Sequence, residues 1–179
     1  LELEREPFDP AALLHEVERM SAIKAQSRNL RLEVNIAANV PAAVEGDAMR
    51  IKQVLLNLVG NALKFTERGQ VVLGLCRSED GLEFSVVDTG PGIPELSQAR
   101  LFQRFEQVDG PHRNAGSGLG LAICRELVHA MEGRIALQSS VGMGSAFRVD
   151  LPLREATKEA VVPAISPQPA IAKKTLHVL

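Results

Sequence analysis

The sequence predicts an α/β protein, because segments with helical periodicity alternate with segments of strand periodicity. Residues 10–27 place apolar side chains at the spacing of one helix face, and Pro10 suits the first turn. Residues 30–37 alternate apolar and polar side chains, as a half-buried strand does. A chain of 179 residues is long enough for one sizeable domain with a short appendage.

The remaining elements follow the same two periodicities. We expect a helix capped by Asp47, a hairpin around the turn sequence SEDG, a helix stopped by Gly133, and two strands joined through VGMG. In chain order these features occupy residues 47–65, 70–88, 119–131 and 133–153. Residues 89–118 are rich in glycine, proline and charge, with a short helical piece near 96–105. A connection of that length is usually functional.

Composition places the chain among soluble globular proteins. Hydrophobic residues make up 45% and charged residues 23%, and the formal net charge is −2. This balance argues against binding to a nucleic-acid backbone, and no apolar run approaches the ~20 residues of a membrane helix. No signal peptide is visible. Cys76 and Cys124 fit neither a redox nor a metal spacing, which indicates reduced, mostly buried thiols in a cytoplasmic domain.

The two ends of the chain differ in composition from the domain between them. We assign residues 10–154 to the domain and 1–9 to a linker from an upstream segment. Residues 155–172 form a second linker, rich in proline and alanine, and 173–179 turn strand-like again. Because the chain opens without methionine, we interpret it as a piece of a longer protein.

A narrow polar stripe runs along the helix expected at 47–65. Arg50, Gln53, Asn57, Asn61 and Lys64 fall within one arc at about 100° per residue, with apolar side chains on both flanks. Asparagine is a mediocre helix former, so two of them one turn apart need a reason. One alternative is that they lie at the surface or bond to a neighbouring loop. The other is a polar groove floor, where carboxamide oxygens suit Mg²⁺ and a lysine suits phosphate.

Three glycine-rich segments favour the groove. VDTGPGI follows a strand with Leu82, Phe84, Val86 and Asp88 on one face, so a carboxylate is expected where the core begins. A simple Asx turn, in which the Gly90 amide donates to Asp88, is the alternative. GSGLGLAI opens a helix and leaves amides exposed for phosphate, although its spacing fits neither a dinucleotide fingerprint nor a P-loop. The third segment, GMGSAF, is also typical of a hairpin turn.

Together these segments resemble the ATP-binding catalytic domain of sensor histidine kinases, whose superfamily also contains gyrase-type topoisomerases, a heat-shock chaperone and mismatch-repair ATPases. The resemblance covers about residues 1–153. Four motifs occur in the family's order: NLVGNALKFT as the N box, DTGPG as G1, LFQRF as the F box and GSGLGL as G2. The implied fold is a two-layer α/β sandwich, the Bergerat fold. Its sheet is mixed and mostly antiparallel, its helices cover one face, and a mobile ATP lid spans about residues 94–115.

The resemblance also implies roles for individual residues. Asn61 coordinates the Mg²⁺ that bridges the ATP phosphates, while Asn57 and Lys64 support the metal and phosphates as catalytic residues. Asp88 accepts a hydrogen bond from the adenine amino group, and Gly92 lets the base approach the backbone. The other ATP-binding residues implied by the motifs are Gly90, Ile93, Phe102, Phe105, Gly116, Ser117, Gly118, Leu119, Gly120, Leu121 and Ser145.

The sequence departs from its relatives at two lid positions. Ala115 stands where many relatives have a second glycine before G2, which predicts a stiffer lid. Gln107 stands where some relatives place an arginine near the γ-phosphate, and Arg104 or Arg113 is a candidate substitute.

Phosphoryl transfer in this family needs partners. The acceptor is a histidine on a separate helical hairpin that also forms the dimer, and we expect that hairpin upstream of Leu1. His15 lacks the Thr-Pro or Asn-Pro of the acceptor motif, and we interpret His112, His129 and His177 as non-acceptors too. The other expected partner is a receiver domain or response regulator, because KTLHVL resembles a first receiver strand.

We expect this piece to be monomeric and cytoplasmic, with no nucleic-acid or membrane contact, and the whole protein to be a homodimer, with or without an inner-membrane anchor. Two rival functions stay open. Gyrase-type ATPases carry a glutamate at the position of Asn57 to activate water, and asparagine cannot act as that base. A non-catalytic nucleotide-sensing module would keep the same pocket, and a serine kinase of the anti-sigma type is a third alternative.

Overall fold

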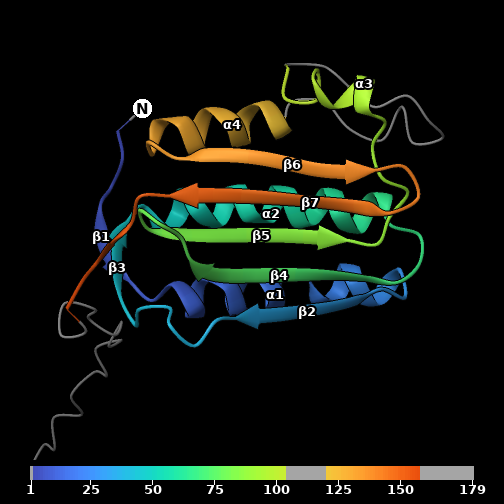
Figure 1. Ribbon diagram of the computed structural model, residues 1–179. Coiled ribbons are helices and arrows are strands. Elements are labelled where there is room, and N and C mark those ends of the chain that lie inside the picture. The colour runs from blue at the N-terminus through green and yellow to red at the C-terminus, as the bar shows by residue number, and fades with distance from the viewer. Residues whose placement is uncertain (1, 104–119, 158–179) are drawn as a thin grey trace, which may run out of the picture.

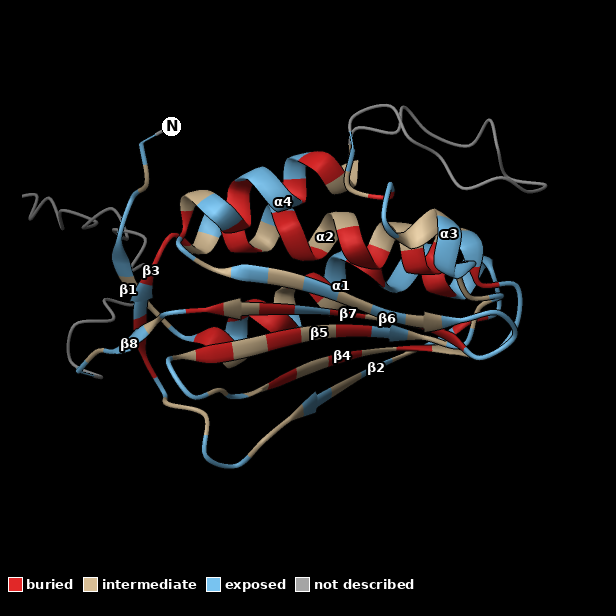
Figure 2. Ribbon diagram, turned by 45° about the horizontal axis from the view of Figure 1, so that its top comes forward, coloured by how far each residue is buried: buried red, intermediate tan, exposed pale blue. Residues whose placement is uncertain are grey.

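Helices cover one face of a sheet in the computed structural model, which describes residues 2–103 and 120–157 (Figure 1). Figure 2 shows the two layers from the side, with α1, α2 and α4 above the strands. The helices are α1 (Pro10–Ser27), α2 (Ala48–Phe65), α3 (Glu95–Gln98) and α4 (Gly120–Ala130). The strands are β1 (Glu6–Phe8), β2 (Arg31–Ile36), β3 (Val44–Gly46), β4 (Gln70–Arg77), β5 (Leu82–Asp88), β6 (Arg134–Ser140), β7 (Gly144–Leu151) and β8 (Arg154–Glu155).

The main sheet has five strands in the order β2-β4-β5-β7-β6. Only β2 and β4 pair in parallel, and the crossover between them passes through α2. The other three pairings are antiparallel. The predicted two-layer fold with a mixed, mostly antiparallel sheet is therefore confirmed, and so are the two hairpins, β4–β5 and β6–β7.

Side-chain caps explain where the two long helices begin. The carboxylate of Asp9 accepts from the Ala12 amide at 3.0 Å, directly before Pro10. Asp47 does the same for α2, accepting from the Arg50 amide at 3.1 Å. The bounds of α1 and the predicted cap of α2 are thus confirmed.

The end of α4 differs in detail from the expected glycine stop. Glu132, with φ of 61°, takes the left-handed conformation, and the Gly133 amide then donates to the Val128 carbonyl at 2.9 Å. A Cβ on Gly133 would collide with the Asp150 carbonyl. Gly133 is therefore required for close packing against β7, and the residue before it turns the chain.

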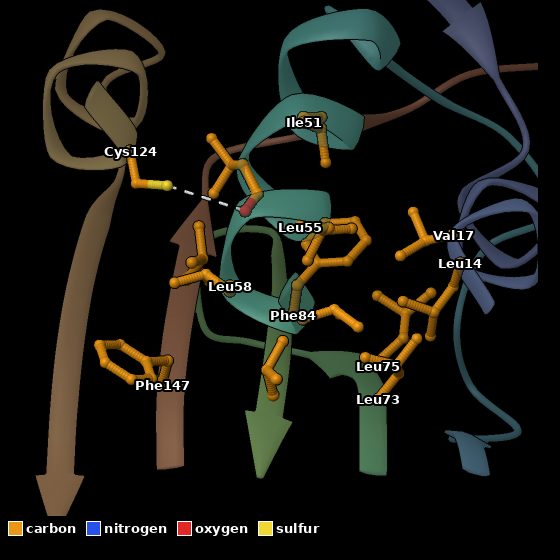
Figure 3. Close-up of a cluster of buried hydrophobic side chains, with 14 of the residues drawn as sticks. Leu14, Val17, Ile51, Leu55, Leu58, Leu73, Leu75, Phe84, Cys124 and Phe147 are labelled. Carbon is orange, nitrogen blue, oxygen red and sulfur yellow. Dashed lines mark hydrogen bonds between the residues drawn. The ribbon is translucent and has the colours of Figure 1, made fainter. Parts of the chain in front are cut away.

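The core lies between the sheet and α2 (Figure 3). Leu55 and Leu58 of α2 meet Leu73 of β4 and Phe84 of β5, and all four are at most 1% exposed. Because α1 and α4 flank α2 on either side, this helix is apolar on both flanks of its polar stripe (Figure 2). None of the helices in the described ranges is long and apolar enough to cross a membrane.

A second, three-stranded sheet has the order β1-β3-β8. Residues 6–8, within the segment expected to be a linker, form β1 and pair with β3, while β8 pairs with the other edge of β3. Asp47 joins this sheet to α2, because its second carboxylate oxygen accepts from the Glu4 amide at 3.1 Å. Strands of two or three residues are too short to show a periodicity, which is why the sequence did not indicate them.

The helical piece expected near 96–105 is shorter than predicted. Only Glu95–Gln98 form a helix, α3, and no side chain caps it. Residues 104 and 105 lie outside the described part. Without a cap or a buried side chain, a single turn has little to stabilise its extension.

Candidate functional site

The polar stripe predicted on α2 is present and partly exposed. Arg50, Asn57, Asn61 and Lys64 are half-buried, and Gln53 is exposed. The stripe is not part of the core, because the buried side chains of α2 are all apolar. It therefore offers a line of polar groups along the helix.

Asn57 connects α2 to the first residue of α4. Its amide nitrogen donates to the Gly120 carbonyl at 2.9 Å. A Cβ on Gly120 would lie only 2.6 Å from the Asn57 side-chain oxygen, so glycine at this position makes room for the carboxamide. One of the sequence alternatives for Asn57 was a bond to a neighbouring segment, and the structure shows such a bond. A ligand contact by Asn57 stays a prediction.

The Cys124 thiol lies beside this contact and is held in its protonated, unreactive form. Burial raises the pKa of Cys124 to about 12, although the Asn57 side chain lowers it somewhat. The sulfur is fully buried and lies 3.7 Å from the Val54 carbonyl (Figure 3). Cys76 is half-buried, and burial together with the carboxylates of Glu83 and Asp150 raises its pKa as well. Both cysteines are free thiols.

Asn61 and Lys64 differ from Asn57 in having no such contact. The Asn61 carboxamide makes no hydrogen bond to another residue of the described ranges. Within the described part of the chain, the Lys64 ammonium group contacts the ring of Phe65, with 5.4 Å between its nitrogen and the ring centroid. Among the described residues no cluster of three His, Cys, Asp or Glu side chains could hold a metal. A carboxamide such as that of Asn61 nevertheless fits Mg²⁺, which keeps several waters and takes phosphate oxygens as further ligands.

Three polar side chains form a row across the end of the main sheet. Asp88 of β5 is opposite Ser145 of β7, and Ser145 is opposite Ser139 of β6. Residues directly opposite each other in antiparallel strands point to the same face. This face is the one that the helices cover, because Phe84, Val86 and Phe147 on it are buried. The row therefore lies at the edge of the core, next to the loops.

Asp88 is a half-buried carboxylate with two backbone donors. Its Oδ1 atom accepts from the Gly90 amide at 2.8 Å, which is the Asx bond considered from the sequence. Burial raises the pKa of Asp88, and the amides of Gly90 and Ser145 oppose that rise. A carboxylate has about four acceptor positions, so two of them remain for a ligand.

The loop after Asp88 lies directly against the β6–β7 turn. Gly92 has φ of 75°, and a Cβ on it would collide with the Ser140 carbonyl. Gly144 has φ of 81°, and a Cβ there would collide with the Asp88 carbonyl. The expected reason for glycine at position 92 was approach by the base. In the structure its side-chain direction faces the protein, so contact between two backbone segments already requires glycine there.

The remaining predicted residues divide between described and undescribed parts. Phe102 packs edge-on against Phe147, with ring centroids 6.2 Å apart, and Ile93 packs against the core. Leu121 is half-buried near the start of α4. Phe105, Gly116, Ser117, Gly118 and Leu119 lie outside the described residues, as do Gln107, Ala115 and most of the predicted lid.

Two of the histidines judged to be non-acceptors can be placed. His15 is exposed on α1 with its ring nitrogen 3.1 Å from the Glu18 carboxylate, and His129 is exposed near the end of α4. His112 and His177 lie outside the described residues.

Sequence reasoning missed three residues at this site. Ser139 and Gln98 hydrogen-bond to the loop after Asp88. Thr66, directly after α2, is fully buried, and its hydroxyl oxygen is the one buried side-chain polar atom in the described ranges without a partner. A Cβ on Gly90 would lie 3.1 Å from this oxygen, so the N-box segment touches G1 here. The sequence signal for Thr66 was its place as the final threonine of NLVGNALKFT, whereas Ser139 and Gln98 are brought to the site only by folding.

Comparison with known proteins agrees with this arrangement. Residues 46–155 match the family described as histidine kinase-, DNA gyrase B-, and HSP90-like ATPase. The chain is 41% identical over 152 residues to the signal transduction histidine-protein kinase BarA of Escherichia coli (strain K12), covering 81% of this chain and 17% of that one. It is 42% identical over 155 residues to the sensor histidine kinase RcsC of the same strain, covering 86% of this chain and 16% of that protein. The chain thus spans less than a fifth of these relatives.

Solved structures show the same fold. Full-length ShkA in complex with AMPPNP has a TM-score of 0.80 and 35% identity, covering 87% of this chain and 32% of that chain. The nucleotide-free catalytic domain of histidine kinase ThkA has a TM-score of 0.72 and 30% identity, covering 85% of this chain and 96% of that domain. With its motifs, its sheet and these matches, the chain belongs to the histidine kinase-, DNA gyrase B- and HSP90-like ATPase family and is a catalytic domain of the histidine kinase type.

Proposed function

We propose that this domain binds Mg·ATP and donates the γ-phosphoryl group to a histidine on a separate helical hairpin. The observation that carries the proposal is that α2 and the residue after it meet two other motifs. Asn57 bonds to Gly120 of G2, and Thr66 approaches Gly90 of G1. The Asn61 carboxamide and the Lys64 ammonium group lie between these two contacts on the same helix, and neither hydrogen-bonds to another described residue. That ShkA was solved with AMPPNP supports a nucleotide as the ligand.

The residues divide by chemistry into a base end and a phosphate end. At the base end the Asp88 carboxylate accepts from the adenine amino group, because a carboxylate can only accept hydrogen bonds. At the phosphate end Asn61 is a ligand for Mg²⁺, which neutralises phosphate charge when bound. Lys64 contacts the phosphate chain as a point charge. Asn57 supports this end by fixing α4 against α2, with the amides of G2 binding phosphate oxygens.

The position of Asn57 favours transfer to a protein over hydrolysis. An ATPase of the gyrase type needs a carboxylate there to take a proton from water. A carboxamide cannot take that proton, and the Asn57 amide nitrogen instead donates to the Gly120 carbonyl. Hydrolysis by this domain alone is therefore expected to be slow.

The test uses labelled ATP and a dimerisation hairpin of this family that carries its acceptor histidine. Incubation of the hairpin with the 179-residue chain should produce phosphate on the hairpin that is labile in acid and stable in base. The chain alone should bind Mg·ATP without becoming labelled. Phosphohistidine within the chain itself would contradict our interpretation of its four histidines. Rapid release of inorganic phosphate without a hairpin would favour the ATPase alternative.

A further inference from the structure

The hydroxyl of Ser139 has three hydrogen-bond partners beside the site. Its Oγ atom accepts from the Ile93 amide at 2.8 Å and donates to the Gly144 carbonyl at 2.9 Å. It also lies 2.8 Å from the Oγ atom of Ser145. One side chain of β6 thereby contacts the loop after Asp88 and the first two residues of β7.

The number of protons fixes the direction of the contact between the two serines. A serine hydroxyl carries one proton and two lone pairs. Because a carbonyl oxygen only accepts, Ser139 must give its proton to Gly144 to make that bond. The bond between the hydroxyls then requires Ser145 to donate. Ser145 is left with lone pairs only, so toward any other partner it is an acceptor.

A second side chain holds the same loop from the other direction. The Gln98 amide nitrogen donates to the Ile93 carbonyl at 2.8 Å and to the Ser139 carbonyl at 3.0 Å. The Gly142 amide adds a bond to the Pro91 carbonyl at 2.8 Å. Both backbone groups of Ile93 are thus bound to protein, one by Ser139 and one by Gln98. Protein groups alone thereby fasten the loop after Asp88 to the β6–β7 hairpin.

We propose that Ser139 is a positioning residue of the adenine site, which fastens the loop after Asp88 and makes Ser145 a hydrogen-bond acceptor beside the Asp88 carboxylate. Two neighbouring acceptors select a base that presents a donor. Adenine offers its amino group at that edge, whereas guanine offers a carbonyl oxygen. Ser139 therefore contributes to base choice without touching the base. This inference rests on the proposed function, because it assigns the same site to ATP.

The test compares ATP and GTP binding by calorimetry in the wild type and in Ser139→Ala. The alanine leaves the Ile93 amide without its acceptor and lets Ser145 turn its proton toward the base. ATP affinity should fall about tenfold, and the ATP-over-GTP preference should shrink by a similar factor. Ser139→Thr keeps the hydroxyl and should restore most of both. Ser140→Ala removes an exposed hydroxyl one residue away and should behave as the wild type.

Two further measurements separate positioning from general stability. Hydrogen exchange at the Ile93 amide should accelerate in nucleotide-free Ser139→Ala but not in Ser140→Ala. In a Ser145→Ala background, Ser139→Ala should change the base preference less than in the wild type, because it acts through Ser145. Should Ser139→Ala not fold, Ser139→Cys keeps the size with weaker hydrogen bonding and should shift the preference in the same direction.

A folded Ser139→Ala variant with wild-type ATP affinity and an unchanged base preference would overturn the role of Ser139 while leaving the proposed function intact. A wild-type chain that binds no nucleotide would instead refute the proposed function. Independent, additive effects of the Ser139 and Ser145 substitutions on base preference would also count against the inference, because they would show that Ser139 does not act through Ser145.

Discussion

On α2 the side chains of Asn61 and Lys64 make no hydrogen bond to another described residue, whereas Asp88, Ser145 and Ser139 at the end of the sheet are bonded to their surroundings. In the row on the sheet, Asp88 accepts from the Gly90 amide, and Ser139 bonds to the Ile93 amide and the Gly144 carbonyl. Among the described residues, the side chains of the stripe on α2 make one hydrogen bond to another element, from Asn57 to Gly120. Both regions are polar and partly exposed, so the difference lies in how far the protein itself satisfies them.

The difference indicates that the two ends of the site are stabilised in different ways. Groups already bonded to the protein lose little freedom when a ligand binds, so the proposed base end would be preorganised. In the proposed complex the side chains of Asn61 and Lys64 take metal and phosphate as partners, so the ligand would complete the phosphate end. Substitutions at the phosphate end should therefore change Mg²⁺-dependent binding, whereas substitutions at the base end should change the preference for ATP over GTP.

The largest effect on binding is expected at Asn61. Asn61→Ala removes the proposed metal ligand and should weaken Mg²⁺-dependent nucleotide binding by about a hundredfold. The fold should remain intact, because alanine is the better helix former and no described residue loses a hydrogen bond. Calorimetric titration with and without Mg²⁺, beside a thermal melt, measures both quantities. If the variant unfolds while the wild type does not, Asn61 has a structural role and the comparison with the sheet fails.

Asp88→Asn is expected to act at the base end by about tenfold. A carboxamide accepts less strongly from adenine and can donate to guanine, so ATP affinity should fall and the preference over GTP should narrow. Titration of both nucleotides into the folded variant measures this. An ATP preference that survives unchanged would show that Asp88 does not bind the base.

The raised pKa of Asp88 also predicts that the stability of the fold depends on pH. Burial raises the pKa of its carboxyl group in the folded state, so the folded state binds the proton more readily than the unfolded one. Burying the charged carboxylate lowers the free energy of unfolding. This loss of stability is fully present above the raised pKa and disappears as pH falls below the ordinary pKa range of aspartate. Asp88→Asn should match or exceed the wild type in thermal stability at neutral pH, and that advantage should vanish in acid. An advantage that grows in acid would contradict the direction of the pKa shift.

Gly120→Ala should have a smaller effect, on stability. The new Cβ would displace the Asn57 carboxamide and break its bond to the Gly120 carbonyl, at a cost of about 1 kcal/mol. In an Asn57→Ala background the same substitution should cost nothing or stabilise, because the obstacle is gone and alanine favours the helix. Denaturant unfolding of the four proteins measures the coupling. Equal effects in both backgrounds would mean that Asn57 and Gly120 are independent.

The smallest effect is expected at Thr66. Its buried hydroxyl has no partner among the described residues, so Thr66→Val should be neutral or gain up to about 1 kcal/mol. Thr66→Ser is the matched control, because it keeps the hydroxyl and loses the methyl group, and it should be less stable than the wild type. A clear loss of ATP affinity in a folded Thr66→Val variant would show that the hydroxyl binds the ligand and belongs with the stripe on α2.

Local chemistry explains what the sequence predicted correctly. Asp47 sits directly before a helical pattern, and capping needs only that residue and the next three. Alternation in 82–88 placed Asp88 on the same face as Leu82 and Phe84, because side chains of a strand alternate with period two. The motifs indicated the family, and the mixed sheet with its helices on one face followed from that resemblance.

Contacts between distant segments could not be predicted in this way. The short strands β1, β3 and β8 exist because they pair with one another across the chain, and their few residues show no pattern. Whether Asn57 meets a ligand or Gly120 depends on where α4 lies, 63 residues further along.

The sequence by itself therefore determined the helices, the hairpins and the identity of the motif residues, because each depends on neighbours within a few positions. Only the tertiary structure decided how those residues are used. It placed Ser139 opposite Ser145 and beside Ile93, and it turned Gly92 toward the Ser140 carbonyl. It also left the Thr66 hydroxyl without a hydrogen-bond partner among the described residues. The physical reason is that hydrogen-bond partners and packing distances belong to pairs of residues that only folding brings together.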